Sequence, residues 1–200
     1  MKSNFNQLAA QRRSIYALGK NVTATPEEIY QLVTTAVRNS PSAFNSQPVR
    51  AVVLFNQASN QVWEIVAEAL AKVVTDPAAF EQTKQKIASF RAGIGTVLFL
   101  TDTASVHKLE EQFPAYADNF ADWAEQAIGG SQQAVWTALA EQGIGASLQH
   151  YNPLIDDAIH QAFDLPADWQ LRAEMPFGSI EGPAGDKEYL EEKQVFKLIK

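Results

Sequence analysis

One short apolar segment limits the folds open to this chain more than any other feature. Residues 95–101 read GTVLFLT, a run of strand length that contains no charged side chain. A strand with one solvent face alternates apolar and polar residues, so an unbroken apolar run is typical of a strand buried on both faces. The chain has 200 residues and is 46% hydrophobic, which suits one domain, or two small lobes, with a sizeable core. We therefore expect this run to be a central strand.

The segments around this strand are predicted from helical spacing, start signals and strand-forming residues. Thr25, Pro26 and Glu28 form the clearest helix start, because threonine caps, proline suits the first helical position and glutamate completes a capping box. Helices are predicted at residues 4–12, 25–39, 61–74, 77–90, 103–112, 119–142 and 153–163, and strands at 49–55, 95–101, within 143–148 and at 169–177. This order predicts an α+β fold (mixed α/β layer), with a central sheet of about four to five strands flanked by helices.

The longest predicted helix, residues 119–142, contains Gly129 and Gly130 near its middle. Each glycine costs a helix about 1 kcal/mol relative to alanine. Two interpretations remain open: either the helix breaks here, or another part of the structure approaches the backbone closely at this point.

Composition excludes several classes of function. The net charge is −7 and no basic run is long enough to follow a phosphate backbone, so nucleic-acid binding is not expected. The absence of cysteine excludes disulfides, thiolate catalysis and cysteine-bound zinc, and the three histidines are not spaced as metal ligands. The N-terminal residues resemble no signal peptide, and no apolar run reaches about 18 residues, so a cytoplasmic protein without a membrane segment is expected.

Common catalytic motifs are also missing. The sequences GIG at 93–95 and 143–145 precede strand-like segments, whereas a dinucleotide-binding loop follows a strand and opens a helix. Ser147 lacks the GxSxG setting of a hydrolase nucleophile.

Two polar segments are candidate binding elements. Arg12, Arg13 and Ser14 combine two guanidinium groups with a hydroxyl, a good set of donors for a phosphate. The loop SPSAFNSQP at 40–48 carries Asn45 and Gln47, whose neutral carboxamides both donate and accept hydrogen bonds. The simpler alternatives are an exposed arginine pair and a polar loop that caps the next strand.

Taken together, these segments resemble a known family. RRSIY at 12–16, SPSAFNSQP, GIGASLQHYNP at 143–153, MPFGSI at 175–180 and a lysine-rich end occur in one order. The chain resembles the FMN-dependent nitroreductases over essentially its whole length, and most closely the short branch that contains the fatty-acid-repression-type nitroreductases. The resemblance implies a nitroreductase-like fold and a single FMN-binding domain over residues 1–200.

The resemblance also implies the cofactor-binding residues. By position in the family motifs they are Arg12, Arg13 and Ser14 for the flavin phosphate and ribityl chain, Asn45 and Gln47 along the flavin, Leu148, Gln149 and His150 at its reactive edge, and Lys193, with Lys187 as a weaker candidate, reaching back to the phosphate. No side chain is implied as an obligate acid or base, because the chemistry takes place at the flavin N5.

The implied activity is the reduction of nitroaromatics or quinones by NADH or NADPH in a ping-pong scheme. The implied assembly is a homodimer with FMN at the subunit interface. The 119–142 helix is compatible with this, since Phe120, Trp123 and Trp136 give it more apolar surface than one small domain readily covers. Two alternatives remain: a flavin-binding regulatory or redox-homeostasis protein with low turnover, and an α/β binding domain without flavin.

Overall fold

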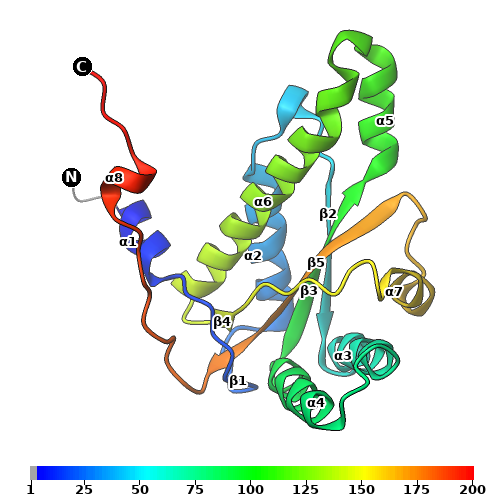
Figure 1. The fold of residues 1–200 in the computed structure, drawn as a ribbon, viewed down its shortest axis with the longest axis vertical. Coiled ribbons are helices and arrows are strands. Elements are labelled where there is room, and N and C mark those ends of the chain that lie inside the picture. Colours follow the sequence, from blue (N-terminus) through cyan, green and yellow to red (C-terminus); the bar gives the residue numbers. More distant parts are fainter. Residues whose placement is uncertain (1–3) are drawn as a thin grey trace.

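The computed structural model describes residues 4–200, which form an antiparallel sheet covered by helices (Figure 1). The helices are α1 (Asn4–Gln11), α2 (Pro26–Asn39), α3 (Asn56–Ala71), α4 (Pro77–Arg91), α5 (Thr103–Gln112), α6 (Ala117–Glu141), α7 (Asp156–Phe163) and α8 (Glu192–Val195), with 3-10 turns η1 (Ala43–Asn45) and η2 (Pro114–Tyr116). The strands are β1 (Leu18–Gly19), β2 (Val49–Phe55), β3 (Gly95–Asp102), β4 (Gly145–Ala146) and β5 (Trp169–Ile180). The predicted mixed helix and sheet fold is confirmed.

The apolar run at 95–101 forms the inner strand β3. The sheet order is β1-β5-β3-β2, β4 pairs with β5, and all of these pairs are antiparallel. Every residue of β3 from Gly95 to Thr101 is buried. The prediction of a central strand buried on both faces is therefore confirmed.

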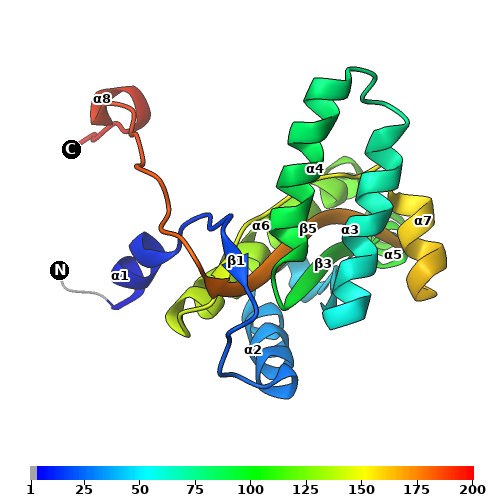
Figure 2. The same cartoon turned by 90° about the horizontal axis from the view of Figure 1, so that it is seen from below.

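Helices cover both faces of the sheet, and the side chains of β3 alternate between them. Val97 and Phe99 pack in one core with buried residues of α2 and α6, while Leu98 and Leu100 pack in a second core with α3, α4 and α7. Because successive side chains of a strand point to opposite faces, a strand between two helical layers is apolar at every position. Figure 2 shows the strands between α2 on one side and α3 with α4 on the other.

The start of α2 follows the sequence signal closely. The Thr25 hydroxyl accepts a hydrogen bond from the Glu28 amide at 3.2 Å, and the Glu28 carboxylate accepts one from the Thr25 amide at 2.8 Å. The capping box is thus complete, and the helix ends at Asn39, before Pro41.

Several elements differ from the prediction: α7 begins at Asp156 instead of 153, β5 continues to Ile180 instead of 177, and α8 was not predicted. α3 begins at Asn56 instead of 61, because the Asn56 amide bonds to the carbonyl of Ile94 and the chain turns directly from β2 into the helix. β1 was not predicted, since its two residues are too few for a strand pattern; they pair with Ser179 and Ile180 at the end of β5.

The paired glycines do not break α6, which runs through all 25 residues from Ala117 to Glu141. A Cβ atom placed on Gly129 or Gly130 meets no atom within 4 Å. Both expectations about this pair therefore fail within the described chain: the helix is continuous, and nothing in residues 4–200 approaches its backbone there.

After Gly182 the chain leaves the body of the molecule, on the side where α1 lies (Figure 1). Large apolar side chains are exposed on this C-terminal segment, among them Tyr189, Leu190, Phe196, Leu198 and Ile199. None of the helices found in residues 4–200 is long and apolar enough to cross a membrane.

Candidate functional site

A cavity of about 390 Å³ brings the N-terminal arginines together with the C-terminal segment. It is lined by Arg12, Arg13, Ser14, Tyr16, Gly185, Asp186 and Lys187. The Arg13 guanidinium donates a hydrogen bond to the Gly185 carbonyl, which ties two segments that are 172 residues apart in the sequence. The lining carries three cations and one carboxylate, in a chain whose net charge is −7. The cavity is thus a local positive site on an acidic protein.

Arg12 is the best-defined donor of this cavity. Its guanidinium lies 4.4 Å from the ring centroid of Trp136, and the Trp136 ring N–H donates to the Ala146 carbonyl at 3.2 Å. The Arg12 Nε is buried and has no hydrogen-bond partner among the described residues. Buried polar groups normally find a partner, so an unpaired guanidinium N–H beside a cavity favours an anionic ligand there.

The segment after α1 is held in position by the sheet. The Ile15 amide donates to the Ala146 carbonyl at 2.9 Å, and Ser14 forms a parallel bridge with Ala146. The arginines and Ser14 are thereby positioned beside β4, directly before the segment that contains Leu148, Gln149 and His150.

The two lysine candidates of the tail lie in different places. Lys187 lines the cavity with Arg12 and Arg13. Lys193 lies on α8, outside the lining, and pairs with Glu191 at 2.7 Å. The structure therefore groups the weaker sequence candidate with the arginines and leaves the stronger one apart.

The second predicted element, the loop at 40–48, has a constrained backbone. Phe44, Asn45 and Gln47 have φ angles of 55°, 51° and 49°, in the left-handed region that non-glycine residues rarely adopt. The Gln47 amide donates to the Ser42 hydroxyl at 2.9 Å, and Arg50 donates from Nη1 to the Gln47 carbonyl at 2.8 Å. Asn45 and Gln47 themselves are exposed, and the Gln47 side-chain amide donates a long hydrogen bond, at 3.4 Å, to the Asn45 carbonyl.

Phe44 fixes this loop to an aromatic cluster at the start of α6. Its ring centroid lies 4.9 Å from that of Phe113, 5.6 Å from that of Phe120 and 6.2 Å from that of Trp123. A hollow of about 550 Å³ lies beside this cluster and is lined by Pro41, Ser42, Ala43, Phe44, Trp123, Gln126, Ala127 and Gly130. Phe120 is buried within the chain, so it does not form part of an exposed apolar face as the sequence suggested.

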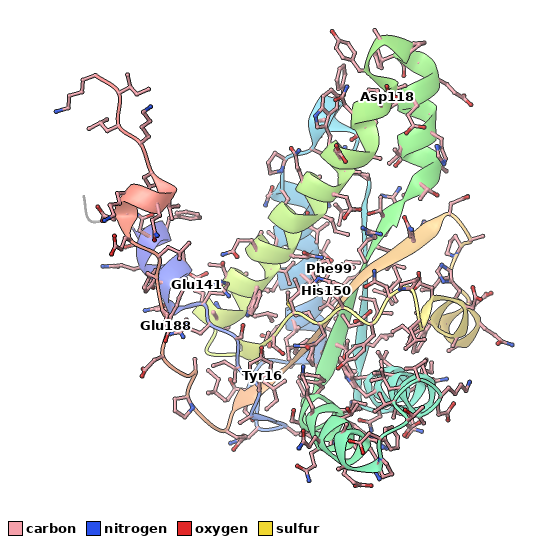
Figure 3. The ribbon with its side chains drawn as sticks, viewed as in Figure 1. Tyr16, Phe99, Asp118, Glu141, His150 and Glu188 are labelled. Atoms are coloured by element: carbon pink, nitrogen blue, oxygen red, sulfur yellow. The ribbon has the colours of Figure 1, made fainter. Side chains whose placement is uncertain are left out.

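The two predicted halves of the site lie near opposite ends of α6. Arg12 packs on Trp136, whereas Phe44 packs on Trp123, thirteen residues earlier in the helix. At about 1.5 Å per residue, the two contacts are separated by about 20 Å along the helix axis. Figure 3 labels Asp118 and Glu141 at the two ends of α6, with Tyr16 and Glu188 toward the Glu141 end. One chain therefore does not bring Asn45 and Gln47 to the arginines.

The third predicted segment lies across β5. Gln149 exchanges two backbone hydrogen bonds with Glu174, at 2.8 and 3.0 Å, and its buried side chain donates to the Ser147 hydroxyl. Leu148 is partly exposed and His150 is exposed. Leu148 and His150 can thus reach a ligand through their side chains, whereas Gln149 is turned into the protein.

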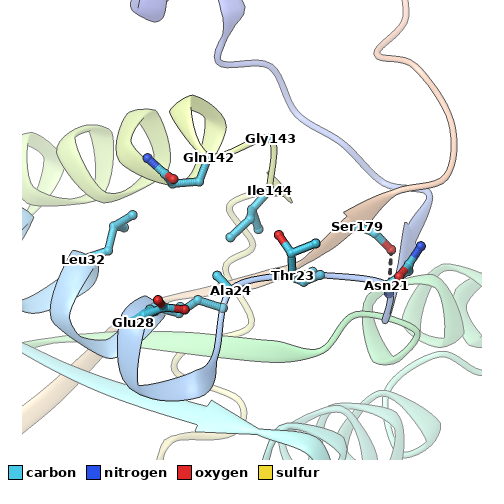
Figure 4. A pocket seen from close by; sticks show the side chains of 11 residues that line it. Asn21, Thr23, Ala24, Glu28, Leu32, Gln142, Gly143, Ile144 and Ser179 are labelled. Atoms are coloured by element: carbon cyan, nitrogen blue, oxygen red, sulfur yellow. Dashed lines mark hydrogen bonds between the residues drawn. The ribbon is translucent and has the colours of Figure 1, made fainter.

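A further cavity, of about 570 Å³, contains none of the predicted residues (Figure 4). It lies between the segment at 21–24, α2 and the end of α6, with Val22, Ile29, Leu32 and Ile144 among its apolar lining residues. The Asn21 amide closes one side of it by donating to the Ser179 hydroxyl at 3.0 Å. Among residues 4–200, no buried unpaired polar atom lines this cavity.

Sequence reasoning missed three residues that support the site. Trp136 lies under Arg12, Arg50 holds the 40–48 loop and pairs with Asp102, and Glu174 lies beneath the 149–151 segment. Arg50 and Glu174 carried a signal, because each is a charged residue inside a segment predicted as a strand. The role of Trp136 depends on a contact with a distant segment and left no local trace.

Comparison with known proteins agrees with the fold. Residues 9–179 match the Nitroreductase family. HBN1 of Saccharomyces cerevisiae is 36% identical over 181 residues, which are 90% of this chain and 89% of HBN1. Nitroreductase CinD from Lactococcus lactis, solved in complex with nicotinic acid, is 47% identical, with a TM-score of 0.91 over 98% of this chain and 100% of CinD.

CinD was also solved in complexes with chloramphenicol and with 4-nitrophenol, each 46% identical to this chain. A protein from Desulfovibrio desulfuricans, solved in complex with FMN, shares the fold at 17% identity and a TM-score of 0.70, over 100% of this chain and 99% of that protein. The family match and the identity to HBN1 both cover most of the chain. Together they show a nitroreductase-type oxidoreductase. The protein belongs to the nitroreductase family.

Proposed function

We propose that this chain is an FMN-dependent NAD(P)H oxidoreductase that reduces nitroaromatics or quinones. The observation that carries the proposal is the cavity that joins Arg12, Arg13, Ser14 and Lys187, with the unpaired Arg12 Nε beside it. FMN, when bound, supplies the redox chemistry, in which a ping-pong exchange passes electrons from NADH or NADPH to the acceptor.

The residues of the cavity fit a phosphate monoester. The guanidinium groups of Arg12 and Arg13 and the ammonium group of Lys187 provide charged donors, and Ser14 adds a neutral one. Leu148, Gln149 and His150 follow β4 in the chain, and this segment is proposed to line the reactive edge of the ring. Lys193 remains a proposed outer contact. No side chain is assigned as an obligate acid or base.

A homodimer completes the proposed site. Phe44 and Arg12 contact α6 at points about 20 Å apart along the helix axis, so a second copy is proposed to supply the carboxamides of Asn45 and Gln47 to the same flavin. Gly129 and Gly130 support this arrangement, because they leave an open strip of α6 backbone on which a second chain can pack closely. In this proposal residues 1–200 form one FMN-binding domain, in the cytoplasm, without a nucleic-acid partner.

The proposed acceptors are planar aromatic compounds. The hollow at the start of α6 has walls from Phe44 and Trp123, which suit a flat aromatic ring. The complexes of the relative CinD with 4-nitrophenol and chloramphenicol, both nitroaromatic compounds, support the same class.

The proposal is tested by titrating flavin-free protein with FMN, FAD and riboflavin, and then adding NADH or NADPH without oxygen. We expect one FMN per chain, weaker binding of riboflavin because it lacks the phosphate, bleaching of the flavin by a nicotinamide, and its recovery with menadione over repeated cycles. Protein that binds no flavin would overturn the proposal. Binding without turnover would instead identify the regulatory flavin-binding alternative.

A further inference from the structure

Glu174 is a buried carboxyl group that the proposed function does not use. It lies in β5 opposite Leu98 of β3, and its exposed fraction is 0%. Its Oε2 accepts a hydrogen bond from the Tyr151 amide at 3.0 Å. Its Oε1 has no hydrogen-bond partner among residues 4–200. A fully buried acid with one unsatisfied oxygen is costly, so its retention calls for a physical reason.

Glu174 holds the segment at 149–151 at two points. Its backbone exchanges two hydrogen bonds with Gln149, and its side chain bonds the amide of Tyr151 two residues further on. The Tyr151 ring packs above Trp63 of α3, with ring centroids 6.2 Å apart. The position of Leu148, Gln149 and His150 therefore depends on the state of one side chain beneath them.

The surroundings of Glu174 favour its neutral form. Leu98 of β3 and Trp63 of α3 are uncharged, and Asp156 at the start of α7 adds a negative charge nearby. Asp156 itself faces two basic side chains, and both have other partners: Arg172 of β5 pairs with Glu125 of α6 at 2.9 Å, and the ring nitrogens of His160 contact the carbonyls of Asp156 and Trp169.

These conditions also set the acidity of the group. Burial, and then the charge of Asp156, raise the pKa of Glu174 to about 8, against the opposing bond from the Tyr151 amide. Burial likewise raises the pKa values of Tyr151 and Asp156.

We propose that Glu174 is a positioning residue that holds the Leu148–Tyr151 segment in place as a neutral carboxylic acid, and that its ionisation lets water enter beneath this segment. In the neutral state the buried carboxyl needs no counter-ion. In the ionised state Oε1 carries charge with no donor, and hydration of this charge requires the segment to open. The assignment of this segment to the reactive edge of the flavin rests on the proposed function; the coupling between Glu174 and the segment does not.

Hydrogen exchange of the Tyr151 amide tests the coupling in the full-length, flavin-free protein. Protection factors, corrected for the intrinsic pH dependence of exchange, are measured from pH 6 to 9.5. We expect constant protection at low pH and a fall of about tenfold between pH 7 and pH 9, following the ionised fraction. Glu174→Gln keeps an acceptor for the amide but cannot ionise, so its protection should not fall. Glu64→Gln, which removes an exposed carboxylate of α3, is the matched control and should behave as the unmodified protein.

Asp156→Asn provides a second variant if Glu174→Gln does not fold. The negative charge of Asp156 raises the pKa of Glu174, so its removal should lower that pKa and move the fall in Tyr151 protection to lower pH. A shift to higher pH would contradict this repulsion. A pH-independent protection factor in the unmodified protein, or an equal fall in Glu174→Gln, would overturn the proposal.

The flavin-bound protein separates this proposal from the proposed function. If FMN binds, its absorption spectrum should change with the same midpoint in the unmodified protein and should not change in Glu174→Gln. A bound flavin with a pH-independent spectrum would overturn the positioning role. Failure to bind FMN would overturn the proposed function alone, since the exchange experiment needs no flavin.

Discussion

Arg12 lies between an aromatic ring and a cavity, and this setting separates its role in binding from its role in stability. The cation–π contact with Trp136 contributes about 0.5–1 kcal/mol to folding, whereas a charge-assisted hydrogen bond to phosphate contributes about 1.5–3 kcal/mol to binding. Removal of Arg12 should therefore affect FMN affinity more than the unfolding free energy.

We predict that Arg12→Ala weakens FMN binding about ten- to a hundredfold, measured as flavin fluorescence on dilution. Asn45→Ala should cost less, about 0.5–1.5 kcal/mol, because it removes neutral hydrogen bonds. Lys84→Ala is the control: this lysine pairs with Glu81 on α4 and does not line the cavity, so affinity should remain near that of the unmodified protein. An unchanged affinity in Arg12→Ala would place the phosphate elsewhere.

The burial of Glu174 in the sheet makes the free energy of unfolding depend on pH. Its pKa is about 8 in the folded protein, against an ordinary value of 4.5, so the folded state keeps a proton that the unfolded chain loses. Its stabilising contribution is therefore full below pH 4.5, falls as the pH rises to 8, and is constant above that. The slope is at most about 1.4 kcal/mol per pH unit for one proton.

We predict that Glu174→Gln flattens this dependence and is at least as stable as the unmodified protein at pH 8. Urea unfolding at several pH values between 5 and 9 measures the effect. A slope equal to that of the unmodified protein would mean that Glu174 does not hold the proton.

Among the secondary-structure elements, β2 controls the loop that precedes it. Arg50, near the start of this strand, bonds the carbonyls of Gln47 and Val49 and pairs with Asp102 at the end of β3. The loop contains three left-handed residues, and such strain persists only where neighbouring contacts hold it.

We predict that Arg50→Ala lowers the unfolding free energy by about 1.5–3 kcal/mol, the range for hydrogen bonds to a charged group, and makes the 40–48 loop more sensitive to proteolysis. Arg91→Ala removes a similar side chain from an exposed pair with Glu64 and should cost at most about 1 kcal/mol. Equal losses in the two variants would argue against a special role for Arg50 in the loop.

For the whole molecule, the separation of the two half-sites along α6 leads to a prediction about assembly. Light scattering should give about twice the chain mass of 22.0 kDa. If each flavin contacts the arginines of one chain and the carboxamides of the other, a mixed dimer of Arg12→Ala and Asn45→Ala contains one intact site and one doubly altered site. If each chain forms its own site, the mixed dimer contains two singly altered sites.

FMN titration of purified mixed dimers distinguishes the two arrangements. We expect half of the sites to bind with the affinity of the unmodified protein. Mixed dimers in which both sites bind more weakly than in the unmodified protein, one as in Arg12→Ala and one as in Asn45→Ala, or a monomer that still binds FMN, would contradict the shared site.

Local chemistry alone determined much of this protein. The unbroken apolar run at 95–101 requires cover on both faces, and the capping box at Thr25 stabilises a helix start within four residues, so both could be read from the sequence. The arginine pair before Ser14 is likewise a local signal, because three consecutive residues supply the donors.

The tertiary structure decided what depends on contacts between distant segments. Lys187 rather than Lys193 joins the arginines because the Arg13–Gly185 hydrogen bond fixes the path of the tail, 172 residues further along the chain. Asn45 and Arg12 are kept apart by the continuous helix α6, although the sequence placed them in one predicted site. The pKa of Glu174 is raised mainly because the folded chain buries this side chain completely, and the desolvation of a charge depends on what surrounds a residue rather than on its identity.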